Sequence, residues 1–160
     1  MDYRDTILVG DQVVYKGVTR FRLSSEASEI PDLSRLKELL GLDMDGCHKI
    51  KDLSPLSKLR NLRHLFLDGC TGIMDLSPFA SLEGLWSLSM SGCTGVVDIS
   101  PIANLPFLWI VGLAGCTGLQ DLSPLIHREE RGCKISLPWL YLASHTKLPW
   151  WQRPIRGGHV

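Results

Sequence analysis

The sequence predicts an α/β-type solenoid, in which short coils of similar shape stack in a row. Cys47, Cys70, Cys93 and Cys116 follow one another at intervals of 23 residues. The same step separates the aspartates at 52, 75, 98 and 121 and the prolines at 55, 78, 101 and 124. A fixed period of this size is the signature of a stack of small repeated units, so the 160 residues are expected to form one solenoid.

Each unit is expected to contain a strand, a corner and a short turn. In the second unit Leu65 and Leu67 alternate with a period of two, as in a strand that buries one face. Leu76, Phe79 and Leu82 step by three, as in a tight 3₁₀ turn. The strands are predicted over residues 42–44, 65–67, 88–90 and 111–113.

The corner and the return segment have their own signals. In Asp75-Leu76-Ser77-Pro78 the Ser77 hydroxyl is expected to cap free backbone donors, and Pro78 suits the first helical position. The run that follows is too short for a full helix. Gly72 recurs at 95 and 118, where a side chain would be costly. The first unit has Lys49 at this place and is expected to turn differently.

These units resemble the leucine-rich repeat family. Its pattern Leu-x-x-Leu-x-Leu-x-x-Asn/Cys-x-Leu is matched in four consecutive units from Leu39 to about Leu125. The phrase DISPIANL is similar to the return segment of internalin-type repeats, and GCTGI-x-DLSPL with its 23-residue step is similar to kinetoplastid-type repeats. The resemblance implies a curved solenoid with a concave parallel β-sheet, short 3₁₀ turns on the convex side, and binding of another macromolecule by the concave side.

The ends depart from the pattern because terminal coils must be capped. Residues 6–9 and 12–15 read as a β-hairpin with a two-residue turn, and 18–23 as a further strand. Ile30, Leu33 and Leu36 mark a degenerate first coil. At the other end, 126–132 replaces the return segment and 134–137 supplies a last strand. The predicted organisation is an N-terminal hairpin and capping coil (1–38), four repeats (39–125), and a C-terminal cap with a Trp-rich basic tail (126–160).

Charge and hydropathy narrow the class of protein. Residues 1–125 hold 11 Lys and Arg against 15 Asp and Glu, whereas 126–160 hold 6 against 2. No apolar run approaches the roughly 18 residues of a membrane helix, and the start MDYRDTILVG does not resemble a signal or transit peptide. We therefore expect an intracellular, cytoplasmic protein with reduced cysteines and no membrane partner.

The cysteine column is interpreted as structural. Equivalent residues of successive coils lie roughly 4.8 Å apart, so the four thiols would fill small buried sites and offer weak hydrogen bonds to backbone groups. A straight column of single cysteines does not converge on a zinc tetrahedron. A nucleophilic cysteine needs a partner base, and although His48 follows Cys47, adjacent side chains in a tight corner point apart.

The aspartate column resembles a row of calcium ligands, but turn capping is the favoured interpretation. A calcium site needs several oxygens around one centre, whereas each of these aspartates precedes Leu/Ile-Ser-Pro and can accept backbone hydrogen bonds of the turn. None of the common catalytic or phosphate-binding motifs is present in the sequence. We expect no enzyme, no catalytic residue, no metal, no cofactor and no small-molecule substrate.

The predicted concave face offers a binding surface instead. Its early coils carry Asp43, Asp45 and Asp68, and its late coils carry Trp86 and Trp109 beside small residues. Exposed Trp on a rigid sheet is typical of an interaction hot spot. The alternative is that both Trp side chains pack on the rim of the coils or under the protein's own tail.

The tail leaves three roles open, since its aromatic and basic residues suit RNA, a protein partner, or closure of the last coil. We therefore predict a non-enzymatic protein–protein interaction module, an adaptor or structural subunit of a larger intracellular assembly. The alternative is a ribonucleoprotein component that contacts RNA through its basic aromatic tail. The candidate partner-binding residues are Arg63, His64, Phe66, Asp68, Trp86, Ser89, Trp109, Ile110, Trp150, Trp151, Arg153 and Arg156.

Overall fold

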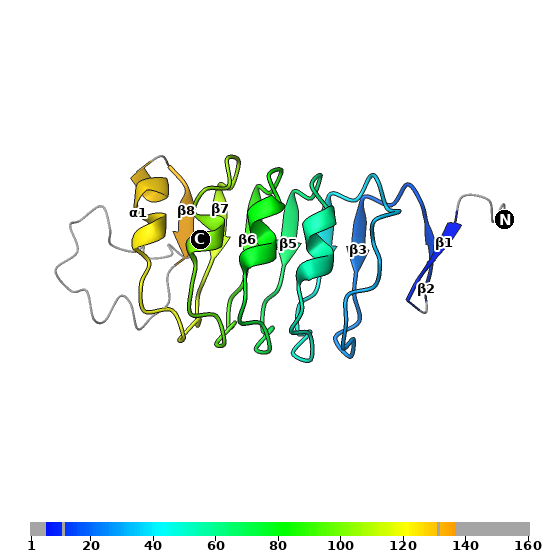
Figure 1. Cartoon of the computed structure of the whole chain (residues 1–160), viewed down its shortest axis with the longest axis horizontal. Coiled ribbons are helices and arrows are strands. Elements are labelled where there is room, and N and C mark those ends of the chain that lie inside the picture. Colours follow the sequence, from blue (N-terminus) through cyan, green and yellow to red (C-terminus); the bar gives the residue numbers. More distant parts are fainter. Residues whose placement is uncertain (1–5, 11, 131, 137–160) are drawn as a thin grey trace, which may run out of the picture.

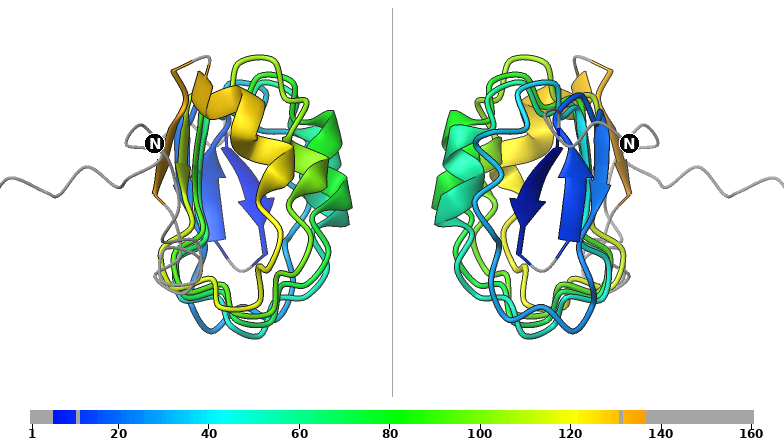
Figure 2. Two further views of the ribbon diagram at one scale, coloured as in Figure 1. Left: turned by 90° about the vertical axis from the view of Figure 1, so that its left-hand side faces the viewer. Right: turned by 90° about the vertical axis from the view of Figure 1, so that its right-hand side faces the viewer.

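The chain forms a solenoid whose coils stack along one axis, which confirms the predicted fold class (Figure 1). The computed structural model describes residues 6–10, 12–130 and 132–136. Viewed along the axis, each coil traces a closed loop with the sheet on one side and the short helices on the opposite side (Figure 2). The strands are β1 (Thr6–Val9), β2 (Gln12–Tyr15), β3 (Arg20–Arg22), β4 (Gly41–Asp43), β5 (His64–Phe66), β6 (Ser87–Ser89), β7 (Ile110–Gly112) and β8 (Lys134–Ser136).

The main sheet is parallel and has the order β3-β4-β5-β6-β7-β8. Leu42 pairs with Leu65, Leu65 with Leu88 and Leu88 with Val111, so the register repeats every 23 residues through the centre of the sheet. Each repeat strand begins and ends one residue earlier than predicted. The ladder nevertheless continues past the assigned end, because the Met44 amide donates to the Phe66 carbonyl oxygen at 2.8 Å.

The core runs along the inside of the coils and consists of the repeat apolar positions. Leu65, Leu88 and Val111 are completely buried, as are the four repeat cysteines. In the described residues no buried side chain is polar or charged. The core is therefore a continuous apolar column in which each coil contacts mainly its two neighbours.

The return segments lie opposite the sheet as 3₁₀ helices, η2 (Ser54–Lys58), η3 (Ser77–Ser81) and η4 (Ser100–Ile102). The predicted proline start is confirmed, but the predicted serine cap is wrong. The Ser77 backbone N–H donates to Asp75 Oδ1 at 2.8 Å, and the Ser77 hydroxyl donates to Asp75 Oδ2 at 2.8 Å. The carboxylate is the acceptor in this corner because it can take both hydrogen bonds at once.

The same bonds occur at Asp52 and Asp98, and Asp121 accepts the Ser123 N–H. These hydrogen bonds hold the pKa of Asp52, Asp75 and Asp121 below the usual carboxyl range. The turn-capping interpretation of the aspartate column is confirmed. Their stabilising contribution is present above the ordinary carboxyl pKa and is lost as the pH falls through the lowered one.

The corner after each strand is the same in all four repeats, so the different turn expected at Lys49 is wrong. His48 N–H donates to the Gly46 carbonyl as Thr71 N–H does to that of Gly69. At Gly72 an added Cβ would lie 2.5 Å from the His48 carbonyl oxygen, whereas Lys49 has room and forms an ion pair with Glu26 at 2.7 Å. The glycine is needed where a full repeat coil precedes the corner, and the first corner follows the shorter capping coil.

The ends of the solenoid are closed by different elements. The β1–β2 hairpin is confirmed and lies across the N-terminal end of the coils, where Ile7 and Val9 are buried (Figure 2). At the other end α1 (Ser123–Glu130) is an eight-residue α-helix, although the sequence predicted a return segment too short for one. This helix extends across residue 125, where the fourth repeat was expected to end. No described helix has the length and apolar character to cross a membrane.

Candidate functional site

The outer face of the six-stranded sheet, referred to as the sheet face, collects most of the predicted partner-binding residues. His64 and Phe66 lie on β5, Ser89 on β6 and Ile110 on β7. Strand register places them in two columns, because residues at the same place in successive strands pair directly. Their columns include Arg20, Gly41, Ser87 and Lys134 in one case and Arg22, Asp43, Gly112 and Ser136 in the other.

The largest exposed side chains of this face come from the residues just before the strands. Trp86 and Trp109 both retain 42% of their accessible surface, and Leu40 stands one and two repeat steps before Arg63 and Trp86 in the same column. Phe66, on β5, is 36% exposed. The sheet face therefore presents three aromatic side chains that are partly open to a partner.

The two indole rings have different neighbours. The Trp86 and His64 rings meet edge to face, with centroids 5.7 Å apart and an interplanar angle of 78°. Trp109 extends towards the following coil, where a Cβ added to Gly132 would lie 3.1 Å from its ring. The rings are thus each supported on one side, which fixes their positions while leaving part of each exposed.

Arg63 is positioned by the backbone of the next coil. Its guanidinium donates from Nη1 to the Gly84 carbonyl oxygen at 3.0 Å. The residue remains exposed in spite of this bond. It can therefore still meet a partner, but part of its hydrogen-bonding capacity is used within the chain.

Aspartates of the early coils serve as links between coils. Asp45 Oδ1 accepts the Asp68 N–H at 2.8 Å, and Asp68 Oδ1 accepts the Ser91 N–H and the Ser89 hydroxyl, both at 2.7 Å. Partial burial raises the pKa of Asp45 above its usual range. Asp68 and Ser89 thus bond to each other, so both candidates act within the solenoid as well as facing outward.

Two arginines of the sheet face were not among the candidates. Arg20 and Arg22 of β3 are exposed on either side of buried Phe21. Arg22 Nε lies 3.5 Å from Asp43 Oδ2. The sequence contained the necessary signal, since a strand was predicted over 18–23 and its alternation places both arginines on the outer face. The early half of the sheet face is therefore of mixed charge and not purely acidic.

The cysteine column behaves as the structural interpretation predicted. Cys70 Sγ donates to the Met44 carbonyl at 3.1 Å, Cys93 to that of Leu67 at 3.1 Å, and Cys116 to that of Met90 at 2.9 Å. Cys47 makes a longer contact, 3.4 Å, to the Ser24 carbonyl. All four are free thiols. Each thiol thus bonds the backbone of the preceding coil.

Burial raises the pKa of the Cys70 and Cys93 thiols to about 12. Below pH 9 the thiols are protonated in both the folded and the unfolded chain, so their contribution to stability is complete. Between pH 9 and 12 only the unfolded chain ionises, and the free energy of unfolding is expected to fall, by up to about 1.4 kcal/mol per pH unit for each thiol.

Urea unfolding of the wild type and of a C70A/C93A variant across this pH range measures that slope. The variant removes both thiols and is expected to show a shallower decline, although it is less stable at neutral pH. Equal slopes in the two proteins would contradict the assignment.

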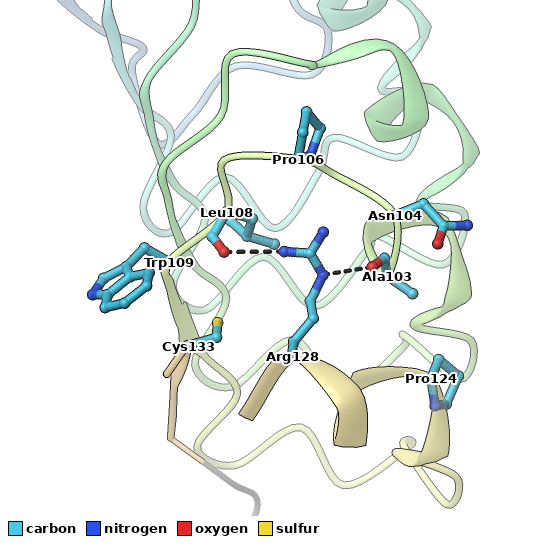
Figure 3. A pocket seen from close by; sticks show the side chains of 8 residues that line it. All are labelled: Ala103, Asn104, Pro106, Leu108, Trp109, Pro124, Arg128 and Cys133. Atoms are coloured by element: carbon cyan, nitrogen blue, oxygen red, sulfur yellow. Dashed lines mark hydrogen bonds between the residues drawn. The ribbon is translucent and has the colours of Figure 1, made fainter. Parts of the chain in front are cut away.

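A cavity of about 510 Å³ opens between the last two coils, beside α1 (Figure 3). Arg128 extends from α1 into it and donates to the carbonyl oxygens of Leu108 at 3.0 Å and Ala103 at 2.5 Å, and also to that of Leu105. Trp109 and Cys133 line the opposite side. The guanidinium closes the open backbone of the fourth return segment, which is a structural role that the sequence did not reveal.

Chemistry of other kinds finds little support among the described side chains. The part of the chain that the structure describes holds no cluster of three or more His, Cys, Asp or Glu suited to a metal ion. Four predicted partner-binding residues, Trp150, Trp151, Arg153 and Arg156, lie outside the described residues. Their role stays a prediction.

Comparison with known proteins gives structural neighbours only. No protein-family model matches the chain, and neither does any curated protein. One similar solved structure is the internalin InlF from Listeria monocytogenes, with 26% identity over 72% of this chain and a TM-score of 0.38. Another is internalin C2 from the same organism, with 19% identity over 80% of this chain and 84% of its own, and a TM-score of 0.37. The chain covers 47% of the InlF chain, about half its length.

Proposed function

We propose that this protein is a non-enzymatic protein-binding module, an adaptor or structural subunit of a larger intracellular assembly. The observation that carries the proposal is the pair of indoles, Trp86 and Trp109, which are 42% exposed on a rigid parallel sheet. Large aromatic side chains with few rotatable bonds lose little entropy when they bind, and they dominate the energy of protein interfaces.

The surroundings of the two indoles support binding by this part of the face. Phe66 adds a third exposed aromatic ring, while Ser87, Ser89 and Gly112 keep the sheet between the rings low. A partner segment can therefore approach the strands closely and pack its own side chains against the rings. The 23-residue register fixes the spacing of these contacts.

The state of the titratable groups also favours binding over catalysis. The repeat thiols are buried with raised pKa values, and Asp45 and Asp68 hold backbone amides of the next coils. A catalytic nucleophile or base needs the opposite, a group whose reactive atom is open to substrate and activated by a neighbour. The internal bonds of this face position a surface and leave no activated group.

The second candidate is a ribonucleoprotein component. It rests on the sequence of the tail, where Trp150 and Trp151 are followed by Arg153 and Arg156. Aromatic stacking combined with basic side chains is the usual means of holding single-stranded nucleic acid. In this version of the proposal the solenoid holds a protein and the tail contacts RNA. Kinship with kinetoplastid-type repeats likewise remains a proposal based on the repeated phrase alone.

Capture of partners from a cell lysate by the full chain, followed by mass spectrometry, tests the proposal directly. We expect a protein partner that remains bound after nuclease treatment. With the purified partner, the affinity should change little between 50 and 200 mM salt, whereas a contact with many phosphates would lose about 10³ to 10⁵ in affinity.

A chain truncated after residue 144 provides the control for the tail. Binding that is unchanged by truncation would assign the partner to the solenoid. Binding that disappears with nuclease, with high salt and with truncation would support the RNA alternative and contradict the protein-binding module.

A further inference from the structure

A small pocket on the early half of the sheet face has arginine walls and a glycine floor. It encloses about 220 Å³ and is bounded by Arg20, Arg22, Asp43 and Phe66 above Gly41. The stem of Arg20 lies over the glycine, since a Cβ added there would be 3.1 Å from Arg20 Cγ. The absence of a side chain at this place in the column therefore creates the pocket.

The charges around this pocket are unequally used. Asp43 accepts the Asp45 N–H at 3.1 Å through Oδ1 and lies 3.5 Å from Arg22 through Oδ2. Within the described part of the chain, the Arg20 side chain makes no hydrogen bond or ion pair. The pocket thus offers one guanidinium without a partner, a second that is only loosely paired, and one exposed phenyl ring.

We infer that the partner binds the sheet face with an extended acidic peptide segment. A carboxylate side chain of that segment enters the pocket between Arg20 and Arg22, and an apolar or aromatic side chain packs against Trp86 and Trp109. A carboxylate is the matching ligand because the planar guanidinium donates two parallel hydrogen bonds to its two oxygens. This inference rests on the proposed function and adds the chemistry of the partner.

The register of the sheet sets the distance between the two contacts. The pocket lies at β3, and the indoles precede β6 and β7, three and four strands further along the sheet. At about 4.8 Å per strand the separation is about 14 to 19 Å, which an extended peptide spans in about four to six residues. The partner segment should therefore carry its acidic and its apolar residue at that spacing.

The same face argues against a nucleic acid as the ligand of this pocket. Asp43, Asp45 and Asp68 lie along the early coils next to the arginines. A phosphate backbone would bring successive negative charges against these carboxylates, whereas a peptide needs only one carboxylate at the arginines. An acidic peptide segment is thus the class of ligand that fits both the arginines and the aspartates.

Selection from a random peptide display library with the full chain tests this inference. Selected peptides should contain Asp or Glu about four to six residues from a large apolar residue. For one selected peptide, changing its acid to the corresponding amide should weaken binding by about tenfold, the scale of a charge-assisted hydrogen bond. R20Q/R22Q should weaken binding of the acidic peptide similarly and should bind both peptides alike.

The matched control is R35Q/R60Q, which removes the same charge from two exposed arginines of the return segments. This variant should bind the acidic peptide as the wild type does. Peptides that depend on Trp86 and Trp109 but show no acidic preference would overturn the inference and leave the protein-binding module standing. A library that yields no peptide dependent on those indoles would overturn both.

Two further outcomes would also overturn the inference. The first is an acidic preference that persists in R20Q/R22Q, because the carboxylate would then bind elsewhere. The second is binding of a single-stranded oligouridylate that R20Q/R22Q abolishes, because the arginines would then hold phosphates.

Discussion

Replacing Leu88 with alanine is expected to lower the free energy of unfolding by about 2 to 5 kcal/mol. The side chain is completely buried in β6, where its backbone pairs with Leu65 on one side and Val111 on the other. Truncation removes apolar contacts and leaves a cavity that two flanking coils of fixed register cannot easily fill. Urea unfolding followed by circular dichroism measures the change.

Leu40→Ala is the matched control, because it removes the same atoms from a leucine that is 41% exposed. We expect this variant to lose much less stability than Leu88→Ala. If the two substitutions cost the same, the assignment of inward and outward positions is wrong.

The double variant Trp86→Ala/Trp109→Ala is expected to weaken partner binding by more than about 2 kcal/mol, roughly a thirtyfold rise in Kd. Both indoles are partly exposed and neither belongs to the apolar core, so binding should suffer far more than folding. The edge-to-face contact of Trp86 with His64 is lost as well, which predicts a small drop in Tm. Calorimetric titration and a thermal melt separate the two effects.

Met74→Ala/Val97→Ala serves as the control for this pair. These side chains are 67% and 65% exposed, are also one repeat apart, and follow the corner of the coil rather than preceding a strand. They should leave the affinity unchanged. A large loss of stability with unchanged affinity in the Trp variant would mean that the indoles brace the coils and that the binding surface lies elsewhere.

The repeat made the central part of the fold predictable from the sequence. A period of 23 residues assigns each leucine of one coil to its equivalent in the next, so pairs such as Leu65 and Leu88 follow directly. The outward positions follow as well, because strand alternation is local. This is why Trp86, Phe66 and His64 could be placed on one face without coordinates.

Features that depend on contacts between coils were less accessible. The helical form of 123–130 required the Arg128 bonds to the fourth return segment, which no local pattern reveals. The aspartates looked like a free acidic surface because their acceptors' partners lie 23 residues away in sequence. Arg20 and Arg22 were missed because they precede the regular repeat, although their strand was predicted.

The glycine at the corner has a consequence for how the length of this protein can change. Gly72 lies against the carbonyls of His48 and Ile50, and the next coils repeat this contact at Gly95 and Gly118. Inserting one residue within a coil would replace the glycine at that contact by a bulkier side chain and rotate every later leucine out of the core. Inserting a whole unit would satisfy each contact again. The chain can therefore lengthen only in steps of one coil, and each added unit would move the indoles about 4.8 Å further from the arginine pocket, like a mark along a ruler.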